Sequence, residues 1–310
     1  MPGIENLDWL ETFVAVVEHG SFSDAAKFLH RSQPRVSAHI ADLERALGGT
    51  VLDRRYRPAV LTDLGTEFLP FARKILRAVA EGHDAVARLT GDVRGRVVIG
   101  CHPSVSAGFM PDVIADVHAA HPEIRVELTE HTTPDIISGL EAGRFHIAVH
   151  SMVNDPAGEG IETVELWVEP YAAVVAEGHP LASAPLPLRP SALRDHALIA
   201  VARPGSGIDP DTRGALTAWG LDEHIAWQSE MPLTVAHLAK RGLGVGILNS
   251  LAAQISQVAG VVALPIHSED YGRRTGASRD RHRAPSAATD AVFDAMRRAA
   301  MPEGTTAPSR

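Results

Sequence analysis

The segment 32–37, SQPRVS, groups side chains that can hydrogen bond to DNA bases. The amide of Gln33 can pair with adenine, the guanidinium of Arg35 with guanine, and the hydroxyl of Ser37 with a base or a phosphate. Pro34 suits the first turn of a helix, because the N–H groups there have no partner within the helix and the φ of proline is already helical. The segment therefore predicts the start of a helix whose first two turns can approach the major groove.

Three short predicted helices position this segment. Between 7 and 20, apolar residues recur at three- and four-residue spacing, and the pattern closes on a glycine, as helices often do. Ser21 or Ser23 can cap a second helix of about two turns, and Ser32 can cap a third that ends at 48–49. Two such helices joined by a tight turn are the sequence form of a helix-turn-helix. A solvated amphipathic helix in some other helical bundle is the alternative.

The third helix divides into an apolar stripe and a polar face. Its stripe is expected to pack inward and consists of Val36, Ile40, Leu43 and Leu47. The side chains expected on or beside the outward face are Arg35, Ser37, Ala38, His39 and Asp42. After this helix, β-prone runs at 51–53 and 59–61 flank a turn with three arginines, which predicts a hairpin wing over the phosphate backbone. The candidates for DNA contact are Arg31, Ser32, Gln33, Pro34, Arg35, Ser37, His39, Arg54, Arg55 and Arg57.

The charge of the chain limits how it can bind DNA. Its 38 acidic residues outnumber its 29 lysines and arginines, for a formal net charge of −9, and the first 65 residues are acidic on balance too. Such a chain does not coat nucleic acid. Binding must depend on where the arginines lie, and a single copy is expected to bind weakly.

The first ninety residues resemble a known family closely. The pattern GSF..AA..L..SQP..S..I..LE..LG followed by LT..G resembles the winged helix-turn-helix of LysR-type transcriptional regulators, and the looser resemblance extends over nearly the whole chain. It implies that Gln33, Pro34 and Ser37 lie in the major groove. The sequence departs from the common pattern at Ala38, where an arginine is usual, and at Leu52, where a phenylalanine is usual. Arg35 stands where the family often has a small apolar residue, so the preferred bases are expected to differ.

A long helix is predicted from 63 to about 90, capped by Thr62. At 1.5 Å per residue it would span about 40 Å. Pro70 is expected to kink or break it. Apolar and small residues follow at alternating spacings of four and three, which is a coiled-coil period. Because no neighbouring segment is large enough to cover these residues, pairing with a second chain is favoured over packing on the same domain. The row is Phe68, Ala72, Ile75, Val79, Gly82, Val86 and Leu89.

From residue 95 onward, strand-like and helical runs alternate, which predicts a largely parallel sheet with helices on its faces. The pattern repeats between 160 and 250 and predicts a second lobe. The expected fold class is α/β with an N-terminal winged helix-turn-helix, a long linker helix and a two-lobed effector domain resembling periplasmic binding proteins. The expected divisions are 1–65 for DNA binding, 66–92 for the dimerising helix, 93–301 for the effector domain and 302–310 for a disordered tail. Lobe I would comprise about 93–165 and 266–301, and lobe II about 166–265.

Ligands in α/β sheets gather where strands end and helices begin. The segment 265–284 is rich in charge and is expected to include an irregular loop. By resemblance to the family, the ligand of the cleft is a small carboxylate or another metabolite. The polar and flanking residues at these junctions could instead serve as helix caps. The candidates for effector binding are Pro103, Ser104, Val105, Ser106, Thr132, Thr133, His150, Ser206 and Met231.

Several other functions are disfavoured by what the sequence lacks. Cys101 is the only cysteine, which excludes an internal disulfide and a multi-cysteine zinc site. The sixteen histidines are scattered without an H-E-x-x-H motif, and neither PGSGI (204–208) nor GLGVG (242–246) has the context of a nucleophile elbow or a dinucleotide loop. No cofactor or metal is expected. The rival hypothesis is a two-lobed α/β enzyme with an N-terminal oligomerisation bundle.

The sequence also sets expectations for location and partners. No apolar run approaches the roughly 20 residues of a membrane span, and the N-terminus does not resemble a secretory signal. A cytoplasmic protein without a membrane partner is expected. The expected partners are double-stranded DNA, a small-molecule effector, further copies of the chain as a dimer or tetramer, and RNA polymerase.

Overall fold

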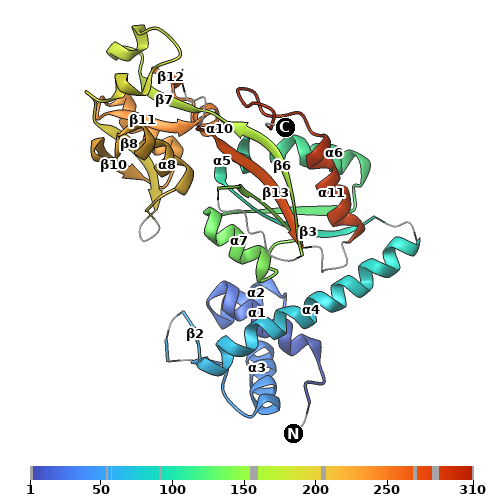
Figure 1. Cartoon of the computed structure of the whole chain (residues 1–310). Helices are drawn as coiled ribbons and strands as arrows, with labels where there is room; N and C mark the ends of the chain where they lie inside the picture. The colour runs from blue at the N-terminus through green and yellow to red at the C-terminus, as the bar shows by residue number, and fades with distance from the viewer. Residues whose placement is uncertain are drawn as a thin grey trace. The chain divides into compact units, whose positions relative to one another are not determined.

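The computed structural model of the chain describes residues 3–53, 55–56, 58–90, 93–153, 160–203, 207–267, 271–280 and 286–308. At 203 and for most residues of 77–90, only the backbone is described. The chain forms two compact units, Met1–Thr90 and Gly91–Arg310 (Figure 1). None of the described helices is both long enough and apolar enough to cross a membrane.

The first unit begins with three short helices, α1 (Leu7–His19), α2 (Phe22–Phe28) and α3 (Gln33–Leu47). The Ser21 hydroxyl caps α2 by accepting the N–H of Asp24 at 3.0 Å. Ser32 occupies the N-cap position of α3 as predicted, but its side chain makes no capping bond. The predicted helix ends are confirmed at Gly20 and Gly48, which both have a positive φ that glycine tolerates. The fully buried core joins all three helices and includes Leu10, Phe13, Ala25, Val36, Ile40 and Leu43.

The predicted hairpin wing is confirmed. Strands β1 (Leu52–Asp53) and β2 (Val60–Leu61) pair antiparallel, with Leu52 opposite Leu61. Of the turn between them, Arg54 and Arg57 lie outside the described residues.

Helix α4 (Asp63–Thr90) follows the wing. Its predicted cap is confirmed, since the Thr62 hydroxyl accepts the N–H of Gly65 at 3.0 Å. Pro70 was predicted to kink or break the helix; it lies inside α4 without ending it, because the hydrogen bonds of the rest of this long helix outweigh the one that proline removes. The expectation that nothing in the unit covers α4 was wrong for its first turns. Ala72 is fully buried there, and the ring of Phe68 lies 6.1 Å from that of Phe13.

The second unit contains two sheets. The first has the strand order β4-β3-β5-β13-β6, in which β3 is parallel to β4 and β5, and β13 is antiparallel to β5 and β6. Its core lies between the sheet and the helices α5, α6 and α11, whereas α7 packs against β5 and β3. The strands are β3 (Gly95–Cys101), β4 (Ile124–Glu130), β5 (Ile147–Ser151), β6 (Ile161–Glu169) and β13 (Arg273–Asp280), and the helices are α5 (Pro103–Gly108), α6 (Met110–Ala120), α7 (Thr133–Glu141) and α11 (Ala287–Arg298).

The second sheet has the order β10-β8-β11-β7-β12, with β9 (Gly207–Ile208) paired to β8. Apolar clusters fill both of its faces. Its strands are β7 (Tyr171–Ala176), β8 (Leu198–Arg203), β10 (Ile225–Ser229), β11 (Val245–Asn249) and β12 (Val261–Pro265). Its helices are α8 (Pro210–Trp219), α9 (Pro232–Lys240) and α10 (Ser250–Ile255), with 3-10 turns at Pro180–Ser183, Pro190–Leu193 and Asp222–His224.

The chain passes between the two sheets twice, from β6 to β7 and from β12 to β13 (Figure 1). Strand β6 extends to Glu169, four residues beyond the boundary of 165 expected for lobe I. Within the charged segment 265–284, which was expected to include an irregular loop, residues 273–280 form β13 between β5 and β6 of the first sheet, and the described residues 266–267 and 271–272 lie outside any named strand or helix. Opposite charges on the neighbouring strand explain this outcome, because Arg274 pairs with Glu165 at 2.6 Å and Arg279 with Glu162 at 2.7 Å.

The disordered tail expected at 302–310 was wrong for its described part, 302–308. Thr306 forms an isolated antiparallel bridge with Val168, with backbone hydrogen bonds of 2.9 Å in both directions. The amide of Gln254 on α10 donates to the carbonyl of Glu303. The polar composition suggested disorder, but the exposed backbone of the end of β6 provides hydrogen-bond partners for the tail.

Candidate functional site

The N-terminal end of α3 projects exposed polar side chains from the first unit. Gln33, Pro34 and Arg35 are exposed, and Ser37 is half-buried on the same side. Gln33 and Ser37 border a hollow that is completed by residues 19–24 around the start of α2 and by Tyr56 of the wing. Donors from α3, α2 and the wing therefore converge on one surface of the unit.

Two of the predicted DNA-contact residues serve the interior of this unit instead. His39 was expected on or beside the outward face, but it is only 7% exposed, and its Nδ1 lies 2.9 Å from the Thr12 hydroxyl on α1. The inward face of α3 is wider than its apolar stripe, because α1 provides a polar partner there. Arg31 is half-buried and pairs with Asp8 of α1 at 3.0 Å, with Glu11 at 3.5 Å.

The structure describes one of the three arginines of the wing. Arg55 is exposed, but its guanidinium donates to Asp53 at 2.5–3.1 Å, and these hydrogen bonds lower the pKa of Asp53 to about 2. The charge of Arg55 is thus balanced within the wing. Arg54 and Arg57, the other two wing candidates, lie outside the described residues.

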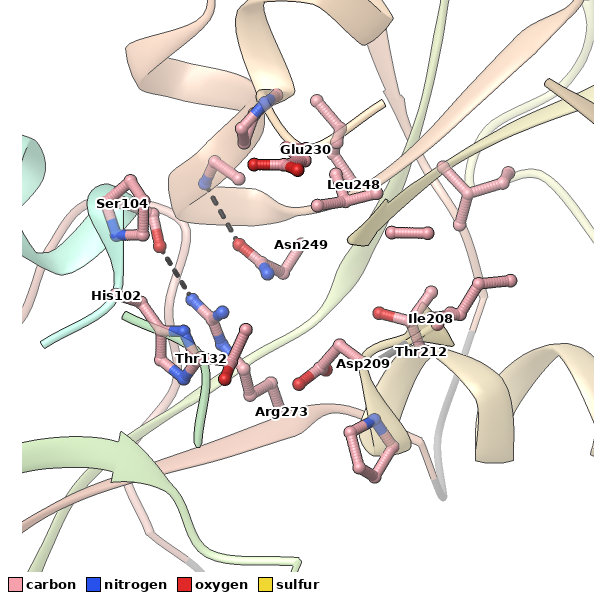
Figure 2. Close-up of a pocket in the computed structure, with 18 of the residues that line it drawn as sticks. His102, Ser104, Thr132, Ile208, Asp209, Thr212, Glu230, Leu248, Asn249 and Arg273 are labelled. Carbon is pink, nitrogen blue, oxygen red and sulfur yellow. Dashed lines mark hydrogen bonds between the residues drawn. The ribbon is translucent and has the colours of Figure 1, made fainter. Parts of the chain in front are cut away.

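A cavity of about 140 Å³ lies between the two sheets of the second unit (Figure 2). One wall comes from the segments after β3 and β4, and the facing wall from β8, β11 and the start of α8. Arg273 of β13 also lines the cavity. The apolar lining includes Val201, Ala202, Ile208, Ile247, Leu248 and Ala252, and the polar lining includes His102, Ser104, His131, Thr132, Asp209, Thr212, Glu230, Asn249 and Arg273.

Three of the predicted effector-binding residues line this cavity, namely Pro103, Ser104 and Thr132. Ser206 lies outside the described residues. Met231 is 49% exposed and is absent from the described lining, although its neighbours Glu230 and Pro232 belong to it. The predicted junctions between strands and helices therefore border the cavity, but only some of the side chains predicted there face it.

Four further candidates point elsewhere and do not belong to the described lining. Val105 is fully buried in the core of the first sheet. Thr133 is 3% exposed, and its hydroxyl lies 3.0 Å from Nε2 of His102. The Ser106 hydroxyl bonds to the thiol of Cys101 and opposes a small part of the rise in its pKa that burial causes. These three side chains do not face the cavity because successive side chains in the first turn of a helix point in different directions.

His150, the fourth of these, is fully buried under the first sheet. Its ring nitrogens lie 2.7 Å from the carbonyl of Ser151 and 2.7 Å from the hydroxyl of Ser278. It follows the alternation of β5, which directs it away from the cavity. Its role is to satisfy buried polar groups, and the predicted contact with an effector was wrong.

Arg273 forms a buried ion pair beside the cavity. Its Nη2 donates to Oε2 of Glu169 at 2.8 Å and to the hydroxyl of Ser104 at 2.8 Å. Glu169 is fully buried, and its Oε1 also accepts the indole N–H of Trp167 and the hydroxyl of Thr275. The two charges lie 104 residues apart in sequence, so sequence analysis had no local signal for the pair.

Two aspartates at the start of α8 lie near this pair. Burial raises the pKa of Asp209, against the opposing effect of Arg273. Burial, and then the charge of Asp209, raise the pKa of Asp211 to about 7. Both carboxylate oxygens of Asp211 are buried without a hydrogen-bond partner among the described residues, although the Ser151 hydroxyl is close enough to lower the pKa. Burial and the charge of Asp211 also raise the pKa of Tyr171.

The lining residues that sequence analysis missed share a recognisable signal. Five described α-helices of this unit begin with a proline in the first turn, and four of these prolines line the cavity, namely Pro103, Pro134, Pro210 and Pro232; Pro111 of α6 is not part of the described lining. The residue before a proline is held in an extended conformation, so it ends the preceding segment with its side chain at the mouth of the helix. A search for this pattern would have selected His102, Asp209 and the vicinity of Glu230.

Cys101 lies directly before His102, but its thiol is not reactive. Its side chain is fully buried at the end of β3. Burial, and to a lesser extent the charge of Glu130, raise the pKa of the thiol to about 12. The thiolate, which is the nucleophilic form, is therefore scarce at neutral pH.

Comparison with protein families matches both units. Residues 7–66 match the bacterial regulatory helix-turn-helix protein, lysR family, and residues 90–301 match the LysR substrate binding domain. Among curated relatives, a hydrogen peroxide-inducible genes activator of Dickeya chrysanthemi is 28% identical over 269 residues, covering 86% of this chain and 87% of the relative. The HTH-type transcriptional regulator ShiR of Corynebacterium glutamicum is 34% identical over 176 residues, covering 56% and 59%.

Solved structures share the fold. A full-length OxyR variant from Pseudomonas aeruginosa superimposes with a TM-score of 0.74 at 19% identity, covering 99% of both chains. CbnR, described as a LysR family transcriptional regulator, has a TM-score of 0.70 at 24% identity, covering 96% of this chain and 99% of CbnR. CbnR has also been solved in complex with its target DNA, with a TM-score of 0.69 to this chain at 24% identity, covering 95% of this chain and 100% of that one.

Proposed function

The chain belongs to the LysR family of transcriptional regulators, and from that premise we propose how its two units divide the work. The N-terminal end of α3 contacts bases in the major groove. The cavity between the two sheets binds a small molecule that controls this DNA binding. The protein acts in the cytoplasm, where its DNA is, with RNA polymerase as a further partner.

The observation that carries the proposal is the division of α3 into two faces. Val36 and Ile40 are fully buried, whereas Gln33 and Arg35 are exposed in the first turn. The amide and the guanidinium are the groups that pair bidentately with adenine and guanine. Because His39 and Arg31 bind to α1, the side chains that remain to contact bases are those of Gln33, Arg35 and Ser37.

Two copies of the chain are needed for tight binding. The domain is acidic on balance, and among the described wing residues the charge of Arg55 is balanced by Asp53, so a single copy is expected to bind phosphates weakly. In a dimer, binding of one DNA-binding unit to its half of the operator holds the second unit near the other half, which raises the affinity without any new contact. A partly palindromic operator is the sequence that such a dimer would select.

The signal is a ligand in the cavity rather than oxidation of a thiol. Some relatives are named hydrogen peroxide-inducible genes activators. In this chain Cys101 is the only cysteine, so no disulfide can form within one copy, and its buried thiol has a pKa of about 12. A small molecule can bias the chain only by binding two arrangements of the lobes unequally, and a cavity lined by both sheets allows this.

The cavity has no catalytic role in this proposal. The Ser104 hydroxyl accepts a hydrogen bond from the guanidinium of Arg273, which carries a permanent positive charge and cannot act as a general base. A hydroxyl in this setting is not activated for attack on a substrate.

The proposal is tested by selecting bound sequences from random duplex DNA at moderate salt. We expect the wild type to enrich a split palindrome, and Arg35→Ala to change the preferred base at one position of each half-site, with roughly 5- to 150-fold less discrimination there. Arg45→Ala is the matched control, because Arg45 is exposed in the last turn of the same helix and pairs with Asp42. Enrichment of no sequence by the wild type would overturn the regulator proposal.

A further inference from the structure

The buried charges beside the cavity do not balance. Three carboxylates, those of Glu169, Asp209 and Asp211, surround the single guanidinium of Arg273. Among the residues whose side chains the structure describes, the ion pair of Arg273 is with Glu169, at 2.8 Å. Neither aspartate forms an ion pair of its own with any side chain that the structure describes in the second unit.

The aspartates differ in how they meet the cavity. Asp209 lines it, and Figure 2 shows its carboxylate on the same side as Arg273 and Thr132. Asp211 lies behind the lining, is 7% exposed, and has both oxygens buried without a hydrogen-bond partner among the described residues. A carboxylate buried in this way is stabilised by a positive charge nearby and destabilised by a negative one.

The charge of a ligand decides how it fits this cluster. A carboxylate would add a fourth negative group around one guanidinium that is already occupied by Glu169 and Ser104. A protonated nitrogen would add a second positive charge and would give Asp209 the partner that Arg273 does not supply. At short range in a site with little water, this difference amounts to several-fold changes in affinity at least.

We infer that the ligand of this cavity carries a protonated nitrogen, which binds beside Asp209, and an aliphatic part, which packs against Val201, Ile208 and Leu248. This inference rests on the proposed role of the cavity as the effector site, and it replaces the carboxylate that the family resemblance implied. Asn249, which Figure 2 shows near the centre of the cavity, offers a further hydrogen bond.

The pH dependence of binding follows from the same groups. Because the pKa of Asp209 is raised by burial, a cation that binds beside it displaces a proton at acidic pH, so its affinity rises from acidic towards neutral pH. The affinity of a carboxylate would fall over the same range. The charges of Arg273 and Glu169 act on Asp209, which also interacts with Asp211 and Tyr171, and the other titratable groups of the described cavity lining are His102, His131 and Glu230.

The test uses the full-length protein and three probes with the same four-carbon body: butylamine, 4-aminobutanoate and butanoate. Binding is measured by calorimetry and by the shift in melting temperature at pH 5.5 and pH 7.5. We expect butylamine or 4-aminobutanoate to bind, more tightly at the higher pH, and butanoate to bind weakly or not at all. Binding of 4-aminobutanoate but not of butylamine would still support the inference, with the carboxylate of the probe as a second group near Arg273.

The variant Asp209→Asn should weaken binding of the amine at least about tenfold, since a charge-assisted hydrogen bond is lost. The amide resembles the protonated acid in shape, so the variant should fold. Glu223→Gln is the control, because Glu223 is exposed on the Asp222–His224 turn and is not part of the described lining. Binding of butanoate alone, of no amine, or of amines equally by wild type and Asp209→Asn overturns the inference. The selection of DNA sequences is independent of these outcomes, so the regulator proposal stands or falls separately.

Discussion

Arg273 and Glu169 form a buried ion pair at the point where the chain crosses between the sheets. Glu169 ends β6 and Arg273 begins β13, so their ion pair joins both crossings. A buried ion pair often adds little net stability, since both charges lose their hydration, but it is costly to break. The pair therefore holds the crossings in register and fixes the position of the guanidinium at the cavity.

Asp211 has the opposite character, because its charge is buried without a direct partner. Its pKa is raised from 3.8 to about 7 in the folded protein. Between these values the folded chain keeps a proton that the unfolded chain has lost, so the free energy of unfolding falls as the pH rises from about 4 to about 7. The stability is lost as Asp211 ionises, and the loss is complete above its folded pKa.

The variant Asp211→Asn should remove this dependence. At pH 5 the variant should be only slightly more stable than the wild type, since Asp211 of the folded wild type is still protonated and most of the loss of stability has not yet occurred. At pH 8 the variant should be more stable, by on the order of 2 to 4 kcal/mol for a pKa shift of about three units. Urea unfolding followed by tryptophan fluorescence measures the difference, because Trp167, Trp219 and Trp227 all lie in the second unit. An equal difference at both pH values would show that Asp211 titrates normally.

At the scale of elements, the cavity is built from junctions between strands and helices. The segments after β3 and β4 and before α8 and α9 each place a proline in the first turn of a helix that borders the cavity. Proline fixes the backbone at the start of the helix, so the residue before it is held at a defined angle to the cleft. The polar lining is thus positioned by four rigid turns.

The junction between the wing and α4 depends on a glycine. A Cβ at Gly65 would lie 2.0 Å from the carbonyl oxygen of Val51, which is a backbone atom and cannot move aside. We expect Gly65→Ala to destabilise the first unit by about 1–3 kcal/mol and to weaken DNA binding through the displaced wing. Gly82→Ala in the same helix is the control, because nothing lies within 4 Å of that Cβ, and it should stabilise α4 by about 0.5–1 kcal/mol.

Hydrogen exchange of peptides from 3–90, together with urea unfolding followed by circular dichroism, measures both changes. Faster exchange at the wing in Gly65→Ala, but not in Gly82→Ala, is the expected result. Equal protection in the two variants would mean that the wing does not rely on the close approach of Gly65 to Val51.

At the scale of the whole molecule, we expect the second half of α4 to form the contact between two copies of the chain. Its first turns are covered by α1, but Ile75, Val79 and Val86 are exposed by 38%, 36% and 61% and recur on one face of the helix. An apolar row of this kind on a long helix is stable in water when a second helix covers it.

The variant Val86→Glu should therefore weaken the dimer, since it places a charge in the interface. Sedimentation should detect monomers at concentrations where the wild type is dimeric, and the affinity for a palindromic site should fall by on the order of 100-fold or more as the linked second head is lost. Ala78→Glu adds the same charge to an exposed position outside the row and should leave both properties unchanged. A Val86→Glu protein that remains dimeric would place the interface elsewhere.

The sequence by itself determined the local features of this chain. Helix starts and ends at Ser21, Thr62 and Gly48, the hairpin wing, the alternation of strands and helices, and the family motif around Gln33 all follow from groups within a few residues of one another. Such features depend on backbone propensity and capping, which short segments carry with them. The positions of the strand ends, and hence of the cleft, could be predicted for the same reason.

Only the tertiary structure decided which side chains meet in the cleft and which are buried. His39 faces inward because Thr12 of another helix offers a hydrogen bond, and residues 302–308 are ordered because β6 offers free backbone groups. The sequence did not predict that Arg273 lines the cavity, because it lies in a charged segment and its partner Glu169 lies 104 residues away. A buried charge is tolerated only where distant parts of the chain together provide its partners, and that condition is set by packing rather than by any local pattern.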